Sequence, residues 1–153
     1  MYYAAVILLL FVFPAASVII EASFSRDAVR FSFLIGRWLV FWAVGVRLFI
    51  AGLRQVLQPR FTAAEIFGIH DSASFAIVRE VGFANLSMGL LGVCTLFRVG
   101  WMVPAAIVGG LYYGLAGLGH VFQKSKNAKE YMAMVSDGFV FLALTAFLAN
   151  SHF

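Results

Sequence analysis

Five side chains that ionise or form strong hydrogen bonds interrupt otherwise apolar stretches of this sequence: Arg47, Glu80, Asn85, His120 and Asp137. A guanidinium beside a carboxylate forms an ion pair or holds an anion, and an imidazole exchanges protons near neutral pH. In apolar surroundings such groups must find polar partners, because leaving them unpaired is very costly. The five residues therefore predict either a binding site or a structural polar cluster.

The composition indicates what surrounds these residues. Hydrophobic residues make up 63% of the chain and charged residues 12%, and the mean hydropathy is +0.95. These values are typical of a protein whose outer surface faces lipid. The net charge of +4 is explained by basic loops at anionic lipid headgroups, so the sequence predicts a lipid bilayer and no nucleic acid as partner.

Five apolar segments have about the length, roughly 20 residues, that crosses a bilayer. They cover residues 2–20, 33–56, 77–97, 101–122 and 131–149. The short connections make neighbouring helices antiparallel and leave no room for a separate soluble domain. The sequence therefore predicts an all-α integral membrane bundle of five transmembrane helices, with residues 1–153 forming one domain.

The longest connection carries the signals of a short interfacial helix at residues 62–67. Thr62 is expected to cap this helix, Glu65 to reach back to the cap, and Gly68 to end it. Its aromatic and charged residues favour a segment that lies flat at the headgroups and roofs the bundle. The segment is either a plain interfacial turn, which the sequence favours, or a lid.

The later spans carry signals for close helix packing. In the third span Gly82, Asn85, Gly89 and Gly92 recur at intervals of three and four residues, and a face of such small residues predicts that another helix approaches closely. Asn127 and Glu130 have the spacing of a helix-capping pair just before the last span. The last two spans are therefore expected to pack as a helical hairpin.

Counting inward from the helix ends places several polar residues at similar depths. At about 1.5 Å per residue, Arg47 lies roughly 13 Å, Asn85 about 12 Å and Asp137 about 9 Å from the same membrane face. Tyr113 of the fourth span reaches the depth of Arg47. An unpaired arginine near the bilayer centre costs at least about 3 kcal/mol, so Asp137 is the expected partner of Arg47.

A second polar layer is predicted nearer the same face and contains Arg54, Glu80, His120 and Glu130. Arg54 follows Arg47 by seven residues on one helical face, so an Arg54–Glu80 pair is expected above the deeper pair. His120 has no second intramembrane histidine and no cysteine at ligand spacing, so neither a metal, a haem nor another cofactor is expected. The sequence identifies no catalytic residue.

Four runs and three single residues carry a resemblance to known proteins: FWAVGVR at 41–47, EIFG at 65–68, REVGFAN at 79–85 and AGLGH at 116–120, with Gly52, Gln55 and Pro59. In these motifs the chain, from about residue 42 to 139, resembles a family of uncharacterised bacterial membrane proteins. In layout it is more distantly similar to the DoxX-like four-helix family, from which its additional first span departs. The first resemblance implies a multi-pass protein of the bacterial inner membrane, and the second implies an accessory subunit of a respiratory or redox complex.

Two functions fit the absence of a catalytic motif. The first is a non-catalytic accessory or assembly subunit, or a small homo-oligomer, whose polar cluster sets the helix register within a larger membrane complex. The second is binding or transport of a small anionic or lipophilic ligand, in which Arg47 holds the ligand beside Asp137, His120 and Tyr113. This second hypothesis predicts a cavity that reaches the turn at residues 62–67.

A third function leaves open whether the protein is an enzyme. A membrane enzyme acting on a lipid or quinone would need the same cavity and a group that exchanges protons near neutral pH. His120 is the candidate for that role.

Overall fold

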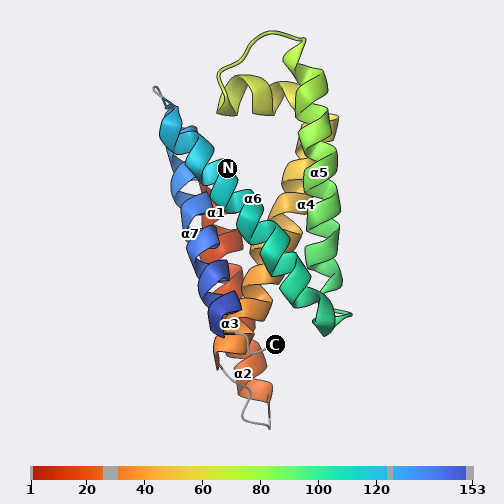
Figure 1. Cartoon of the computed structure of the whole chain (residues 1–153), viewed down its shortest axis with the longest axis vertical. Coiled ribbons are helices and arrows are strands. Elements are labelled where there is room, and N and C mark those ends of the chain that lie inside the picture. Colours follow the sequence, from red (N-terminus) through yellow and green to blue (C-terminus); the bar gives the residue numbers. More distant parts are fainter. Residues whose placement is uncertain (1, 26–30, 124–125, 151–153) are drawn as a thin grey trace.

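The computed structural model describes residues 2–25, 31–123 and 126–150, and within these ranges every regular element is a helix (Figure 1). Five helical stretches are long and apolar enough to cross a membrane: Tyr2–Phe24, Phe31–Leu57, Ser74–Cys94, Val99–Phe122 and Ala128–Asn150. The predicted all-α bundle of five transmembrane helices is confirmed, and the chain is a multi-pass membrane protein. Its first transmembrane stretch continues beyond the expected end at residue 20 to Phe24, because the Ser25 N–H still donates a helical hydrogen bond to the Glu21 carbonyl oxygen.

The first two transmembrane stretches each contain a wider, π-helical segment. Their elements are α1 (Tyr2–Ile7), η1 (Leu8–Val12), α2 (Phe13–Phe24), α3 (Phe31–Leu39), η2 (Val40–Arg47) and α4 (Leu48–Leu57). Pro14 lies in the first turn of α2, directly after η1, where its missing N–H is tolerated. Arg47 is the last residue of η2, so the π-helical segment sets the direction in which this arginine leaves the helix.

The remaining elements are η3 (Phe61–Ile66), α5 (Ser74–Cys94), η4 (Val99–Trp101), α6 (Met102–Phe122) and α7 (Ala128–Asn150). Figure 1 shows α4 and α5 side by side, with the short yellow-green η3 running sideways beside the upper part of α5 and α6 crossing the bundle toward α7. Asn127 Oδ1 accepts a hydrogen bond from the Glu130 N–H at 2.9 Å, and Glu130 Oε2 accepts one from the Asn127 N–H at 3.3 Å. The predicted capping pair is therefore confirmed, and α6 and α7 form the predicted hairpin.

The interfacial helix η3 differs in its first turn from the expectation. It begins after Arg60, and no side chain caps it, so the predicted cap by Thr62 is wrong. Glu65 points instead to Lys129 of α7, because an ion pair with that ammonium replaces the weaker hydrogen bond to a backbone N–H. Gly68 ends the helix as expected, with a positive φ of 68° that suits glycine.

Glycines let α5 lie almost in backbone contact with η2 and α4. A Cβ on Gly92 would stand 2.4 Å from the Gly45 nitrogen, and one on Gly82 would stand 2.9 Å from the Gln55 Cβ. On Gly89 it would meet the Phe49 nitrogen at 2.4 Å. The small-residue face predicted on the third span is therefore filled by the chain's own second span.

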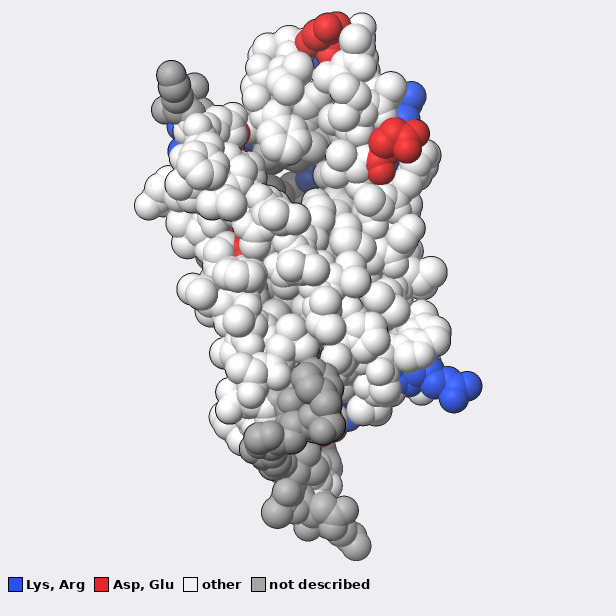
Figure 2. Space-filling model, viewed as in Figure 1, with Lys and Arg blue, Asp and Glu red and all other residues white. Residues whose placement is uncertain are grey.

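The outward faces of the helices are strongly apolar. Large hydrophobic side chains such as Ile77, Leu115 and Leu142 are more than 60% exposed, at 68%, 69% and 67%. Figure 2 shows a broad, nearly uncharged flank, with most of the visible charged side chains near its two ends. Apolar exposure on this scale fits contact with bilayer lipid and does not fit contact with water.

The close contact between α5 and η2 can be tested with Gly92→Ala. We expect this change to lower the free energy of unfolding by about 1 to 3 kcal/mol, because the added methyl group meets backbone atoms that cannot move aside. The measurement is reversible unfolding in mixed micelles.

Gly119→Ala is the matched control, since nothing lies within 4 Å of a Cβ at that position. The control is expected to unfold like the wild type or slightly later. Equal stability of the two variants would contradict the packing described here.

Candidate functional site: a basic pocket beneath the interfacial helix

The Arg47–Asp137 ion pair joins the second and fifth transmembrane stretches, as predicted. Arg47 Nη2 donates hydrogen bonds to Asp137 Oδ1 at 2.8 Å and to Ser136 Oγ at 2.9 Å. Both charged side chains are largely buried, with 14% and 9% of their surfaces exposed. Arg47 Nη1 is buried too, and it has no hydrogen-bond partner among the described residues. Half of the guanidinium is therefore satisfied and half is not.

Tyr113 of α6 supports the guanidinium from one side. The Arg47 Cζ lies 4.9 Å from the centre of the Tyr113 ring, a cation–π distance. The Tyr113 hydroxyl donates a 2.6 Å hydrogen bond to the carbonyl oxygen of Ala43, and the residue is only 2% exposed. The tyrosine thus faces the bundle interior and fixes the position of Arg47 relative to α6.

Asn85 belongs to a separate contact. Its Nδ2 donates a 2.7 Å hydrogen bond to Gln55 Oε1, and both side chains are buried between α4 and α5. The depth of Asn85 was predicted to place it with Arg47 and Asp137, but its hydrogen bond goes to another amide. This amide pair fixes the register of the two helices, because two buried amides in lipid have few other partners.

The predicted Arg54–Glu80 ion pair does not form. Glu80 is exposed, whereas Val78, Gly82 and Asn85 make up the face of α5 that packs on α4. At about 100° per residue, position 80 points about 200° away from that face. Arg54 instead lies over the ring of Phe61, with its Cζ 3.4 Å from the ring centre. Among the described residues it has no carboxylate partner.

His120 lies near the upper end of α6, away from the deeper ion pair. Its Nδ1 is 4.0 Å from Glu130 Oε1, and its ring stacks on Phe67 with ring centres 6.4 Å apart. Within the described ranges, no group of three or more His, Cys, Asp or Glu side chains is placed to hold a metal ion. The histidine therefore contacts the segment after η3 and the start of α7.

The roof segment η3 is tied across the bundle to α7. Lys129 Nζ donates a 2.5 Å hydrogen bond to Glu65 Oε2, and Asn127 Nδ2 donates one to the Ile66 carbonyl at 3.1 Å. The hydrogen bond and the charge of Lys129 lower the pKa of Glu65 below its ordinary value. The segment therefore spans the space between the α4–α5 pair and the α6–α7 pair.

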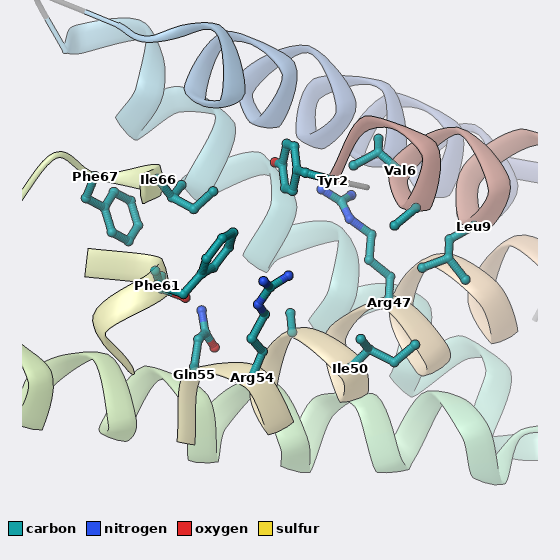
Figure 3. A pocket seen from close by; sticks show the side chains of 13 residues that line it. Tyr2, Val6, Leu9, Arg47, Ile50, Arg54, Gln55, Phe61, Ile66 and Phe67 are labelled. Carbon is teal, nitrogen blue, oxygen red and sulfur yellow. The ribbon is translucent and has the colours of Figure 1, made fainter. Parts of the chain in front are cut away.

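A pocket of about 410 Å³ lies beneath this roof. Its walls come from α1, the second transmembrane stretch and η3, and its lining residues are Tyr2, Ala5, Val6, Leu9, Arg47, Ile50, Ala51, Arg54, Gln55, Phe61, Thr62, Ile66 and Phe67. In Figure 3 the guanidinium groups of Arg47 and Arg54 both extend into the space between α1 and η3, and Tyr2 lies beside Arg47. Figure 2 shows the hollow below the roof, with basic atoms inside it.

The pocket contains Arg47 and Arg54 from the predicted cluster and leaves the other members outside its lining. Asp137 and Tyr113 contact the Arg47 guanidinium but do not line the pocket. Asn85, His120 and Glu80 are not lining residues either. Gln55 and Ser136 were not predicted as members of the polar cluster, although Gln55 directly follows Arg54 and Ser136 directly precedes Asp137. Tyr2 was not predicted either, since an aromatic residue at the start of an apolar run reads as an interface anchor.

The contribution of the Arg47–Asp137 ion pair to the free energy of unfolding can be measured with Arg47→Gln and with the double variant Arg47→Gln, Asp137→Asn. The single change is expected to lower the free energy of unfolding by about 3 to 5 kcal/mol, because it leaves a buried carboxylate without a counter-charge. The double change should recover most of that loss. Reversible unfolding in mixed micelles gives both values.

The comparison for this prediction is the Glu21–Arg37 pair between α2 and α3, whose side chains are 24% and 23% exposed. Arg37→Gln should cost less than Arg47→Gln, since water reaches its partner. A double variant as unstable as Arg47→Gln alone would contradict a buried ion pair at Arg47.

The contact between roof and α7 is expected to depend on pH. Because the folded protein lowers the pKa of Glu65, the contact is complete above the ordinary carboxyl pKa and is lost as pH falls through the lower, folded value. Hydrogen exchange at the Phe67 and Ile69 amides, which bond within this segment, should accelerate in that acid range. Glu65→Gln should show the faster exchange already at neutral pH. Glu80→Gln is the control, and an equally large increase in exchange in that variant would argue against the Glu65–Lys129 contact.

Comparison with known proteins gives one match. The pattern of DUF6790, a family of unknown function, matches residues 1–151. Neither the curated proteins nor the solved structures that were compared contain a match. The match agrees with the expected resemblance to an uncharacterised family, while a bacterial origin and a DoxX-like layout stay predictions. The chain belongs to the DUF6790 family of unknown function.

Proposed function

We propose that this protein binds a small amphipathic anion within the membrane, in the pocket beneath η3. The observation that carries the proposal is the pairing of two arginines with an otherwise largely apolar lining in a cavity of about 410 Å³. Ligand pockets commonly have this size and this character, with a few polar groups that orient the ligand. The ligand-binding hypothesis required a cavity that reaches the interfacial helix, and Phe61, Thr62 and Ile66 line this one.

The charge of the lining favours an anion. Among the described residues, the pocket lining includes Arg47 and Arg54 and no acidic side chain. Asp137 balances the charge of Arg47 from behind, and Arg54 lies on an aromatic ring without a carboxylate partner among the described residues. The pocket therefore has an excess of positive charge, which attracts an anion.

The apolar part of the lining favours an amphiphile over a small inorganic anion. Val6 of α1 and Leu9 of η1 face Ile50 of the second transmembrane stretch across the pocket. A hydrated ion such as phosphate would leave this surface against water, whereas an alkyl or prenyl chain would cover it. The site lies at one end of the bundle, where both the headgroup and the hydrocarbon chain of a membrane amphiphile can reach it.

The structure weakens the grounds for the two other functions. The small-residue seams that suggested a partner subunit or a homo-oligomer are occupied by helices of the same chain, so they give no sign of a partner. The enzyme hypothesis placed His120 in the cavity, and His120 is not among the lining residues. An accessory role and a location in the bacterial inner membrane both stay compatible with ligand binding.

The proposal is tested by titrating decane-1-sulfonate into the protein in phosphatidylcholine nanodiscs, with empty nanodiscs as the blank. Saturable binding is expected to weaken about 10- to 100-fold in Arg54→Gln, since a charge-assisted hydrogen bond contributes about 1.5 to 3 kcal/mol. Arg54 is exposed, lines the pocket and forms no ion pair with any described residue, so the fold should survive.

Arg60→Gln is the matched control, because Arg60, between α4 and η3, is also an exposed arginine but does not line the pocket. Decan-1-ol is the matched neutral probe. Equal binding of the alcohol and the sulfonate, or unchanged sulfonate binding by Arg54→Gln, would contradict an anion site.

A further inference from the structure

We propose that anion binding at Arg47 is coupled to protonation of Asp137, so that the pocket takes up its ligand together with one proton. This inference rests on the proposed function, because it needs an anion in the pocket. It adds that the negative charge brought in by the anion is offset by a proton from solution, which the Asp137 carboxylate accepts.

Arg47 contacts the Asp137 carboxylate and also lines the pocket. Its Nη2 donates to Asp137 Oδ1 at 2.8 Å. Its buried Nη1 has no hydrogen-bond partner among the described residues. An anion that accepts a hydrogen bond from Nη1 would share one guanidinium with the Asp137 carboxylate.

One cation cannot balance both groups in this environment. The titratable and charged groups that act electrostatically on Asp137, within the described part of the chain, are Arg47 of η2, Tyr2 of α1, and Tyr112, Tyr113 and His120 of α6. Arg47 is the one permanent cation in this set, because Arg54, the other arginine of the pocket, lies seven residues and about 10 Å farther along the helix and is not among the groups that act on Asp137. When a ligand anion takes up its charge, two negative groups lie close together in apolar surroundings, and such a pair favours protonation of one of them.

Asp137 is the group that would take the proton. A sulfonate or phosphate monoester stays ionised, whereas a carboxylate in a membrane helix loses its counter-charge when the anion binds. The protonated carboxyl has a hydrogen-bond acceptor nearby, since Ser136 Oγ is 3.4 Å from Asp137 Oδ1 and donates its own hydrogen to Ala133 O at 2.9 Å. The proton comes from solution, and the net charge of the buried site stays unchanged.

The coupling is tested by isothermal titration of the nanodisc-embedded protein with decane-1-sulfonate, which stays ionised throughout. Titrations at pH 6 to 8 in buffers of different ionisation enthalpy count the protons taken up. We expect uptake of about one proton per bound anion, and affinity that rises about tenfold for each unit by which pH falls. Difference infrared spectra should gain the carbonyl band of a protonated carboxylic acid on binding.

Variants show where the proton resides. Asp137→Asn should bind the sulfonate without proton uptake and without the infrared band. His120→Gln should keep both, because His120 is not the proton acceptor in this proposal. Should Asp137→Asn fail to fold, the wild-type infrared band together with His120→Gln still decides the question.

The outcomes separate this inference from the proposed function. Binding without proton uptake, or uptake that is lost in His120→Gln, overturns the coupling and leaves the anion site intact. Absence of saturable binding at every pH overturns the proposed function, and the coupling falls with it.

Discussion

The buried ion pair between Arg47 and Asp137 sets the arrangement of the whole upper half of the bundle. A guanidinium inside an apolar helix bundle needs a carboxylate beside it, and this requirement holds the second transmembrane stretch against α7. Tyr113 then places α6 against the same arginine through its ring and, through its hydroxyl, against the carbonyl of Ala43. Three of the five transmembrane stretches are thus positioned by one side chain.

The pocket follows from how the remaining helices meet this arrangement. Glycines draw α5 tightly onto η2 and α4, so on that side the second transmembrane stretch has no free space. On its other side it faces α1, which begins at Tyr2 beneath η3. The space between them is closed above by η3, which Lys129 and Asn127 tie to the start of α7. The same helix therefore presents Arg47 to a structural partner and to a cavity.

Much of the fold was accessible from sequence because lipid imposes simple constraints. Apolar runs of sufficient length predict the transmembrane helices, and a buried arginine predicts a carboxylate at matching depth, which identified Asp137. Depth alone does not say which way a helix faces, however. Glu80 lies at a suitable depth for Arg54 but on the wrong face of α5, and Asn85 pairs with Gln55 because the glycine seam turns that face toward α4. The pocket depends on Tyr2 and Phe61, whose roles arise from contacts between segments far apart in sequence.

The most direct test of an anion pocket built around Arg47 is native mass spectrometry of the protein extracted gently from its own membrane. The wild-type chain should carry a reproducible small-molecule adduct, and fragmentation should identify it as an acidic amphiphile. The double variant Arg47→Gln, Asp137→Asn removes the cation and its counter-charge together, so the net charge of the protein is unchanged. This variant should lose the adduct. A bare wild-type chain, or one that carries only other protein subunits, would contradict the account and favour a purely structural role for the polar residues.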